Sequence, residues 1–549
     1  MSTALSAQSQ MLGLSVNGST QKETKTIDSL GYNSSFNDFE SLQNEVIDLG
    51  KKLERIGYIE NQLKSLIKDT DSTYLANFSL KKSYRVIHIY NVEVIPSEIL
   101  SLLKIERTAN YLIVRTVALE QTLELINSEM ANLGNPFSRL KLTSISKVKD
   151  GLLQGFLETS ESESRTIDKI IVKGYEKFPK SYLKHYLKIK KGQTFNLSSI
   201  IQKTEDLDNL QFANIIRDPE VLFTKDSTTL YMYIEKNRSN TFDGFLGFGT
   251  NETSNNLEFD GYLDLRLTNN LNYGESLELL YKSDENDQQT LDVTLRTPFL
   301  FGTPIGADLN LNIFRRDSTF STTRQTLKLN YQINARNLFS LGVNLETSTN
   351  LLDNNLSAIE DYEVNRYLVN YRYMKRQNKN ILFPINFLFD LSGGFGNRTA
   401  MDVKNDQYNL ELETFKIFNL NPRNSIYGRI TAKYLDSDNY LENELPRFGG
   451  INSIRGFEEN SLIANLYGVL NTEYRYKLSN SIYAHSVIDA AYFENQITDQ
   501  KEKLFGFGFG FGLLTQAGLF KFNYTSAKTE NQPFRLSDSK IHVSLTALF

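Results

Sequence analysis

The feature that most constrains the fold of this chain is an alternation of apolar and polar residues that starts near residue 240 and continues to the C-terminus. It is clear at residues 263–267, 291–296 and 307–313, where aliphatic side chains alternate with charged, amide or hydroxyl ones. A period of two residues is typical of β-strands with one apolar and one polar face. We count about 16 such segments, at roughly 19 residues for each strand and turn, which predicts an even-numbered antiparallel barrel.

The alternation by itself does not say where the apolar face points. A soluble sandwich turns this face inward, whereas a transmembrane barrel turns it toward lipid and lines its lumen with the polar face. No run of about 18 apolar residues is present, so we expect no helix to cross a bilayer. The aromatic content of 12%, all Tyr and Phe, suits the wall and interfacial girdles of a membrane barrel.

The C-terminal end carries two further strand patterns. Residues 505–512 alternate Phe and Gly, and glycine inside a strand marks a close approach of another backbone or packed element. The last strand places Ile541, Val543, Leu545 and the terminal Phe549 on one face. A final strand of this kind, ending on an aromatic residue, resembles the β-signal of bacterial outer-membrane barrels.

The N-terminal part, from residue 10 to about 238, mixes helical and strand patterns and repeats internally. Apolar residues at helical spacing run from Leu42 to Ile56 and again from Leu119 to Leu133, and a glycine that ends a helix follows each run. Two strand-like runs follow each glycine. We therefore predict two similar α+β units, at residues 10–82 and 83–164.

A third unit, at residues 165–238, has the clearest pattern. A strand at 167–174 precedes helices at 181–187 and 197–210 and a hairpin formed by 214–223 and 229–236. This order resembles a polypeptide-transport-associated (POTRA) domain, which implies a periplasmic module that binds extended chains along a sheet edge. The alternative is a small α+β spacer without a ligand.

Composition argues against catalysis. Cysteine is absent, the net charge is −5, and the four histidines, His88, His185, His485 and His542, lie far apart. No P-loop, HExxH or GxSxG motif is present. We therefore expect no enzyme, no catalytic residue, no metal or other cofactor, and no nucleic-acid partner. Residues 1–9 resemble the end of a secretory signal peptide, with an ordinary frayed terminus as the alternative.

A loop near residues 438–465 interrupts the tightly spaced strands. Its apolar residues, such as Phe448 and Ile451, give it side chains to pack, and its glycines allow tight bends. A loop of this length between short turns is usually functional or disordered, and its composition favours order. Ile454-Arg-Gly-Phe457 within it requires a partner for the guanidinium, unless Arg455 is a solvated loop charge.

Taken together, these residues resemble the BamA/TamA superfamily of outer-membrane assembly and translocation proteins. The resemblance covers POTRA-like units, a 16-stranded barrel and the lid-loop motif formed by Ile454, Arg455, Gly456 and Phe457. It implies that Asp489 and, less firmly, Glu473 hold Arg455, although Ala491 stands where the family usually has glycine. Thr297-Pro-Phe299 resembles a turn motif at the end of the fourth strand.

The family resemblance also implies a weak seam between the first and last barrel strands. We expect it at about 242–249 and 541–549, with Phe242, Gly244, Ile541, Val543, Leu545 and Phe549 as its residues. Client strands are expected to pair with the opened edge, because unpaired backbone groups are costly in lipid.

The resulting prediction is an outer-membrane protein with periplasmic N-terminal domains that inserts or exports client polypeptides, nearest to the TamA-like branch. The implied partners are unfolded outer-membrane or secreted polypeptides, outer-membrane lipid, and periplasmic or lipoprotein accessory subunits. Three alternatives remain: a two-partner secretion transporter for one polypeptide, a passive channel, and a periplasmic tether. The lid-loop motif disfavours the channel, and the lack of a plug helix disfavours two-partner secretion.

Overall fold

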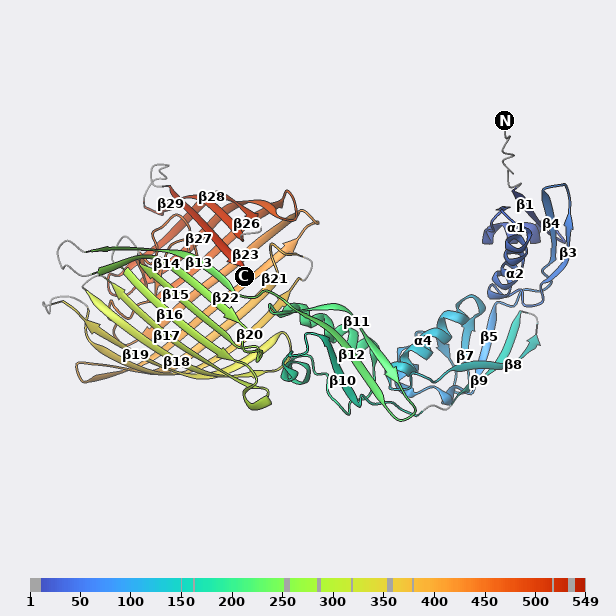
Figure 1. Ribbon diagram of the computed structural model, residues 1–549, viewed down its shortest axis with the longest axis horizontal. Helices are drawn as coiled ribbons and strands as arrows, with labels where there is room; N and C mark the ends of the chain where they lie inside the picture. Colours follow the sequence, from blue (N-terminus) through green and yellow to red (C-terminus); the bar gives the residue numbers. More distant parts are fainter. Residues whose placement is uncertain are drawn as a thin grey trace, which may run out of the picture. The chain divides into compact units, whose positions relative to one another are not determined.

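The computed structural model describes residues 11–149, 151–160, 163–250, 257–283, 288–316, 319–352, 359–377, 380–515, 518–531 and 539–548. The predicted signal-peptide remnant at residues 1–9 and the terminal Phe549 lie outside the described residues. The chain forms two compact units, one of residues 1–167 with 192–199 and the other of residues 168–191 with 200–549 (Figure 1).

The first α+β domain of the first unit has four strands, paired in the order β2-β1-β4-β3. Its elements are β1 (Leu12–Gly18), α1 (Gln21–Leu30), β2 (Ser35–Phe36), α2 (Phe39–Arg55), β3 (Gln62–Lys68) and β4 (Thr73–Ser79). Helix α2 follows Asp38, whose side chain accepts a hydrogen bond from the Ser41 amide and so satisfies one free helical donor. Leu42 and Leu49 of its apolar stripe are fully buried, and Ile56 at its end is partly buried. The helix predicted from that stripe is confirmed.

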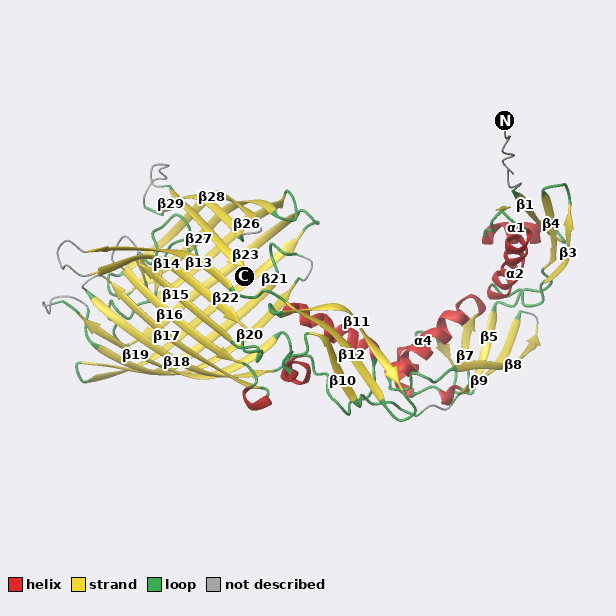
Figure 2. Ribbon diagram, viewed as in Figure 1, coloured by secondary structure: helices red, strands yellow, loops and turns green. Residues whose placement is uncertain are grey.

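The second α+β domain has a five-stranded sheet, in the order β6-β7-β5-β9-β8. Its elements are β5 (Val86–Tyr90), η1 (Val92–Val94), α3 (Ser97–Leu102), β6 (Glu106–Arg107), β7 (Leu112–Arg115), η2 (Thr116–Ala118), α4 (Leu119–Asn132), β8 (Leu140–Lys149) and β9 (Leu152–Thr159). Helix α4 buries Ile126 and Met130 in the apolar core of its domain, as α2 does with its own apolar residues (Figure 2). The matching apolar spacing of the two helices predicts this. Strands β6 and β7 are additions that the pattern did not predict, because they are too short to show a period.

The third α+β domain has a three-stranded sheet in which β10 runs parallel to β12 and β11 antiparallel to it. Its elements are β10 (Lys169–Gly174), η3 (Tyr182–Tyr186), α5 (Leu197–Thr204), η4 (Glu205–Asn209), β11 (Ala213–Phe223) and β12 (Thr228–Lys236). Both predicted helices are shorter than the sequence indicates, since the first is a single π-helical turn and the second changes to a 3-10 turn after Thr204. The Thr204 hydroxyl donates to the Ile201 carbonyl and so competes with the helical ladder.

Within the described residues, 16 antiparallel strands close into a barrel, which confirms the predicted fold class. They are β13 (Thr241–Thr250), β14 (Leu257–Thr268), β15 (Ser276–Ser283), β16 (Gln288–Thr297), β17 (Ile305–Arg316), β18 (Phe320–Gln332), β19 (Asn337–Asn350), β20 (Tyr362–Arg376), β21 (Ile385–Ala400), β22 (Val403–Asn419), β23 (Asn424–Ser437), β26 (Leu466–Lys477), β27 (Ile482–Asn495), β28 (Gln500–Leu514), β29 (Leu519–Thr529) and β30 (Lys540–Leu548). A 3-10 turn, η5 (Leu300–Gly302), lies between β16 and β17.

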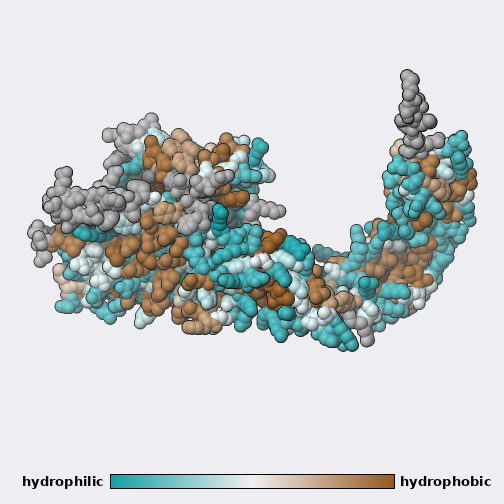
Figure 3. Space-filling view, in the orientation of Figure 1, coloured by the Kyte–Doolittle hydropathy of each residue, from teal (hydrophilic) through white to brown (hydrophobic). Residues whose placement is uncertain are grey.

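The structure places the apolar face of the barrel strands outside and the polar face inside. Leu329 and Leu341 are 54% and 52% exposed, and apolar side chains gather on the outer wall (Figure 3). Asn344, Glu346 and Ser348 of β19 point the other way and are buried. This arrangement excludes the soluble sandwich, whose apolar residues face inward, and it is the arrangement of a barrel that faces lipid. No helix among the described residues is long and apolar enough to span a bilayer.

The third α+β domain contacts the turns of the barrel at the end where the chain enters it. The Phe299 ring, in the turn after β16, packs edge-on against Tyr182 at 4.8 Å between centroids and stacks on His185 at 5.7 Å. His185 Nε2 is 2.8 Å from the Gly302 carbonyl oxygen. Burial raises the pKa of the Tyr182 hydroxyl above its usual range, so it stays protonated and donates to the Gly274 carbonyl. The predicted Thr297-Pro-Phe299 turn is therefore a contact site for this domain.

Candidate functional site

The lid loop, residues 438–465, connects β23 to β26. Two short strands within it, β24 (Arg447–Phe448) and β25 (Leu462–Ile463), pair with each other. Phe448 and Ile454 of the loop are buried in an apolar cluster with Tyr467, Phe493 and other residues of the barrel wall. The loop is therefore ordered by its own apolar side chains, which pack inside a lumen that is otherwise polar.

Arg455 lies at the centre of this site, and the structure brings Asp489 and Glu473 to it. Its Nε and Nη2 donate to the two carboxylate oxygens of Asp489 at 2.8 and 2.7 Å, and its amide donates to Asp489 at 3.1 Å. Nη1 donates to Glu473. Asp489 is on β27 and Glu473 on the adjacent β26, and their side chains point into the lumen. The geometry is the two-pronged arrangement for which a planar guanidinium is suited.

These three side chains are almost completely buried, with exposed fractions of 6%, 1% and 8% for Arg455, Asp489 and Glu473. Arg475 also donates to Glu473, at 2.7 Å, and lies over the Tyr427 ring at 3.9 Å. Two guanidinium groups thus face two carboxylates. A buried set of this kind contributes little net stability when complete, but removing one partner leaves an unpaired buried charge and costs about 3–5 kcal/mol.

Two glycines allow the lid loop to approach the wall this closely. A Cβ atom on Gly506 of β28 would overlap the carbonyl oxygen of Arg455. A Cβ atom on Gly456 would lie 2.8 Å from Ala527 Cβ on β29, and Gly456 has a φ of +95°. The close approach predicted from the Phe-Gly repeat is therefore present at Gly506, where the lid backbone contacts the strand.

The first half of the lid loop contacts a different part of the wall, through residues that the sequence did not reveal. Arg398 Nη1 of β21 donates to Glu444 Oε1 at 2.6 Å, and Gln407 Nε2 of β22 donates to Glu444 Oε2 at 2.8 Å. Arg398 and Glu444 are buried. Asn443 donates to Ser348 Oγ of β19 at 2.9 Å. No motif marks these residues, because the pairing depends on how the loop crosses the barrel.

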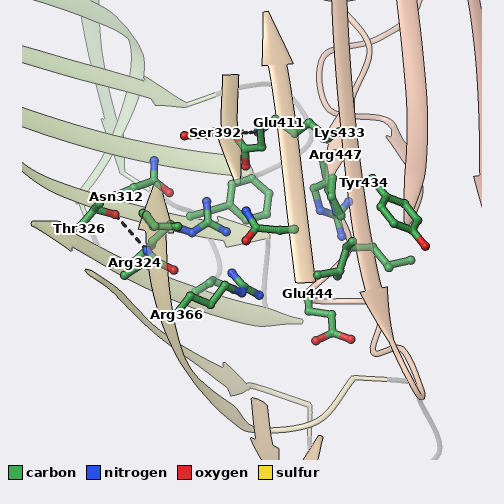
Figure 4. Close-up of a pocket in the computed structure, with 18 of the residues that line it drawn as sticks. Asn312, Arg324, Thr326, Arg366, Ser392, Glu411, Lys433, Tyr434, Glu444 and Arg447 are labelled. Carbon is green, nitrogen blue, oxygen red and sulfur yellow. Dashed lines mark hydrogen bonds and ion pairs between the residues drawn. The ribbon is translucent and has the colours of Figure 1, made fainter. Parts of the chain in front are cut away.

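Between the two halves of the loop and the wall is a cavity of about 390 Å³ (Figure 4). Arg324, Arg366 and Lys433 line it from barrel strands, and Glu444 and Arg447 line it from the lid loop. The lining also includes many Asn, Thr and Ser side chains, so the interior is polar. Among the described residues, no cluster of His, Cys, Asp and Glu is arranged to hold a metal.

The seam between the first and last barrel strands is short. Among the described residues, β13 and β30 pair at two positions, Thr241 with Leu548 and Phe242 with Ala547. Each of these strands pairs with its other neighbour along almost its whole length. Gly244, two residues past the last pair, has a φ of +154°, a conformation that other residues rarely adopt. The described seam pairing ends at Phe242, two residues before this glycine, whereas the pairing of β13 with β14 continues through it.

The other predicted seam residues lie near this edge. Ile541 and Val543 of β30 are 62% and 60% exposed, as expected of side chains that face lipid. Leu545 pairs through its backbone with Phe520 of β29. Phe549 lies outside the described residues, so its predicted role is not addressed.

The fold and these features define an outer-membrane barrel protein whose N-terminal α+β domains lie in the periplasm. Residues 211–545 match the family model described as the Omp85 superfamily domain, and residues 165–237 match a POTRA model described as a surface antigen variable number repeat. The chain belongs to the Omp85 superfamily. Proteins of this family are transporters and assembly factors that act on unfolded polypeptides and are not enzymes.

Two solved structures, both of CdiB, show the same fold. CdiB from Escherichia coli has a TM-score of 0.54 at 14% identity and covers 93% of this chain and 97% of its own. CdiB from Acinetobacter baumannii has a TM-score of 0.53 at 14% identity, with 93% and 98% covered. BamA from Haemophilus ducreyi lacking POTRA domains 1–3 has a TM-score of 0.49 at 14% identity, with 82% and 97% covered. No curated protein matches the chain. The resemblance to the BamA/TamA superfamily is thus confirmed at the level of the family.

Proposed function

We propose that this protein inserts or exports client polypeptides at the outer membrane by opening the seam between β13 and β30, with the lid loop setting when it opens. The observation that carries the proposal is that β13 and β30 pair at two positions along their described residues. Unpaired backbone groups are costly in hydrocarbon, so the remaining edge of β13 and β30 favours a partner strand. A client strand in extended conformation supplies the missing hydrogen bonds.

The Arg455, Asp489 and Glu473 contacts support a role for the lid loop as a fixed element against which the seam moves. We further propose that the three N-terminal units, at residues 10–82, 83–164 and 165–238, are POTRA-like and deliver clients along their edge strands. Strands β3, β8 and β11 are at sheet edges in the respective domains. Three such units favour the TamA-like branch, and periplasmic or lipoprotein accessory subunits are expected partners of these domains.

The first experiment uses a cysteine pair across the seam. Thr241→Cys with Leu548→Cys places the two thiols on directly opposite residues, whose Cα separation suits a disulfide. The natural chain has no cysteine, so the crosslink is specific. Oxidation is expected to stop client assembly in cells and reduction to restore it. Undiminished assembly with the seam fully crosslinked would overturn the proposal.

A second candidate function is export of one dedicated polypeptide through the lumen. The polar lining of the cavity next to the lid loop favours it, because polar side chains can hydrogen-bond the backbone of an unfolded chain. Quantitative proteomics of the outer membrane and the medium after depletion distinguishes the two. Loss of several unrelated barrels supports insertion, loss of one secreted polypeptide supports dedicated export, and no change in either leaves a passive channel or a tether.

A further inference from the structure

We propose that Glu458 and Glu459, at the tip of the lid loop, connect the two sides of the seam and hold it closed. Glu458 Oε1 is 3.1 Å from Lys540 Nζ, at the start of the last strand β30. Glu459 Oε2 is 3.6 Å from Lys282 Nζ on β15, two strands in from the first strand β13. The inference rests on the proposed function, because it explains how the lid loop sets the position of the seam.

The placement of the two carboxylates follows from the local structure of the lid loop. Arg455, three residues before Glu458, is fixed by Asp489 of β27 and Glu473 of β26, three and four strands from β30 in the barrel order. A Cβ atom on Gly450 would overlap the carboxylate of Glu459, so the glycine leaves room for that side chain to fold back. The loop therefore presents adjacent carboxylates in a defined place rather than as free surface charges.

The charges are complementary across the seam. Sheet order runs β15, β14, β13 on one side and β30, β29 on the other, so each lysine belongs to a different side. Both pairs are partly exposed, with side-chain exposures of 34% and 58% for Lys540 and Glu458 and 32% and 29% for Lys282 and Glu459. Exposed pairs contribute little each, but the described residues of the seam pair at two positions, so a small change in free energy changes its opening.

The same cysteine pair measures seam opening directly. The full-length protein with Thr241→Cys and Leu548→Cys is placed in phospholipid vesicles, and the rate of disulfide formation under mild oxidation reports how often the seam is closed. The double variant Glu458→Gln with Glu459→Gln is expected to raise the open-to-closed ratio by about two- to tenfold. High salt is expected to do the same to the natural sequence and to have little effect on the variant.

Glu442→Gln is the matched control. Glu442 is also a lid-loop carboxylate in a partly exposed ion pair, with Arg316 of β17 at 3.0 Å, but β17 is not at the seam. Its neutralisation is expected to leave the trapping rate unchanged. Exchanging the two charges of one pair, Glu459→Lys with Lys282→Glu, is expected to keep the trapping rate of the natural sequence, and mobility of the folded barrel on a gel checks that each variant folds.

Equal trapping rates in the natural sequence and the double Gln variant, or an equal effect of Glu442→Gln, overturn the inference. The outcome is independent of the proposed function. If the double variant opens the seam and client assembly is unaffected by a crosslinked seam, the inference stands and the proposed function fails. If the crosslink stops assembly but the double variant traps normally, the proposed function stands and the inference fails.

Discussion

The two sides of the barrel that meet the lid loop are held in different ways. On one side, β27 pairs with β28 along its whole length, from Ile482 opposite Leu513 to Asn495 opposite Gln500. The lid loop is bound there by its buried guanidinium, which contacts two carboxylates. On the other side, at the seam, the described residues of β13 and β30 pair at two positions. The lid loop reaches the flanks of the seam through two partly exposed lysines, Lys540 of β30 and Lys282 of β15.

This difference indicates that the seam can move more easily than the contact of the lid loop with β26 and β27. Buried ion pairs with several hydrogen bonds are costly to break singly, whereas exposed pairs are worth little and are screened by salt. The buried contacts of Arg455 fix the lid loop to the barrel wall, whereas the exposed ion pairs hold it only weakly to the seam. The lid loop can therefore favour a closed seam without preventing its opening. Each prediction below weakens one of these ties, from the strongest to the weakest.

Removing the guanidinium on the firm side has the largest expected effect. Arg455→Met leaves Asp489 and Glu473 buried with one cation fewer, at a cost of about 3–5 kcal/mol. The lid loop is expected to leave the lumen, so protease digestion of intact vesicles should cut it, and client assembly should fall strongly.

Arg455→Lys tests whether geometry or charge matters, because lysine cannot donate to both oxygens of Asp489 in a planar fork. It is expected to recover only part of the loss. Normal lid protection and assembly in both variants would contradict a fixed lid loop.

The second-largest effect is expected from breaking the ion pair between Arg398 and Glu444, which holds the first half of the lid loop. Arg398→Ala removes the cation that pairs with the buried Glu444 carboxylate, and the loss falls on residues 441–447 because Arg455 remains held. Trypsin is expected to cut after Arg447 and to spare Arg455. Glu444→Gln, which keeps the hydrogen-bonding shape without the charge, should give a weaker effect. Cleavage at both arginines in Arg398→Ala would mean that the two halves of the loop do not act separately.

The close approach at β28 is the third test. Gly506→Ala places a Cβ atom against the Arg455 carbonyl oxygen, so strand or loop must shift, at about 1–3 kcal/mol. A smaller increase in lid digestion is expected than for Arg455→Met. Gly428→Ala, in β23, is the matched control because a Cβ atom there meets nothing within 4 Å. Equal effects of the two substitutions would count against the contact at Gly506.

The smallest effect is expected from removing one exposed ion pair at the seam, that of Lys540 with Glu458. Lys540→Gln removes one partly exposed pair, worth about 0.2–1 kcal/mol, and should accelerate seam opening slightly at low salt only. The disulfide trapping rate, measured over a range of salt concentrations, checks it. An effect as large as that of Arg455→Met would remove the contrast between the two sides.

Much of the fold was predictable because its signals are local. The helical stripe from Leu42 and the alternation at residues 263–267 are read from neighbouring residues, and the structure confirms the helix and the strand. The short β6 was not predicted, because a strand of two residues is too short to show a period. The early end of α5 was not predicted either, because the Thr204 hydroxyl competes there with the helical hydrogen bonds.

The candidate site was partly predictable. Arg455, Asp489 and Glu473 were named because they stand in a recognisable order of motifs, and the structure places them in contact, although their role in function remains a proposal. Arg398 and Glu444 carry no such signal. They are far apart in sequence, and each stands among ordinary strand or loop residues.

The sequence by itself therefore determined the period of the longer elements, the closure into an even-numbered array of strands and the identity of the lid-loop arginine. These properties depend on backbone geometry and on residues close together in the chain. Only the tertiary structure decided that the apolar face points outward, that the seam pairs at two positions and that Glu458 and Glu459 meet lysines on both of its sides. Contacts of this kind depend on strand register and on the path of one long loop across the lumen, and no local pattern records either.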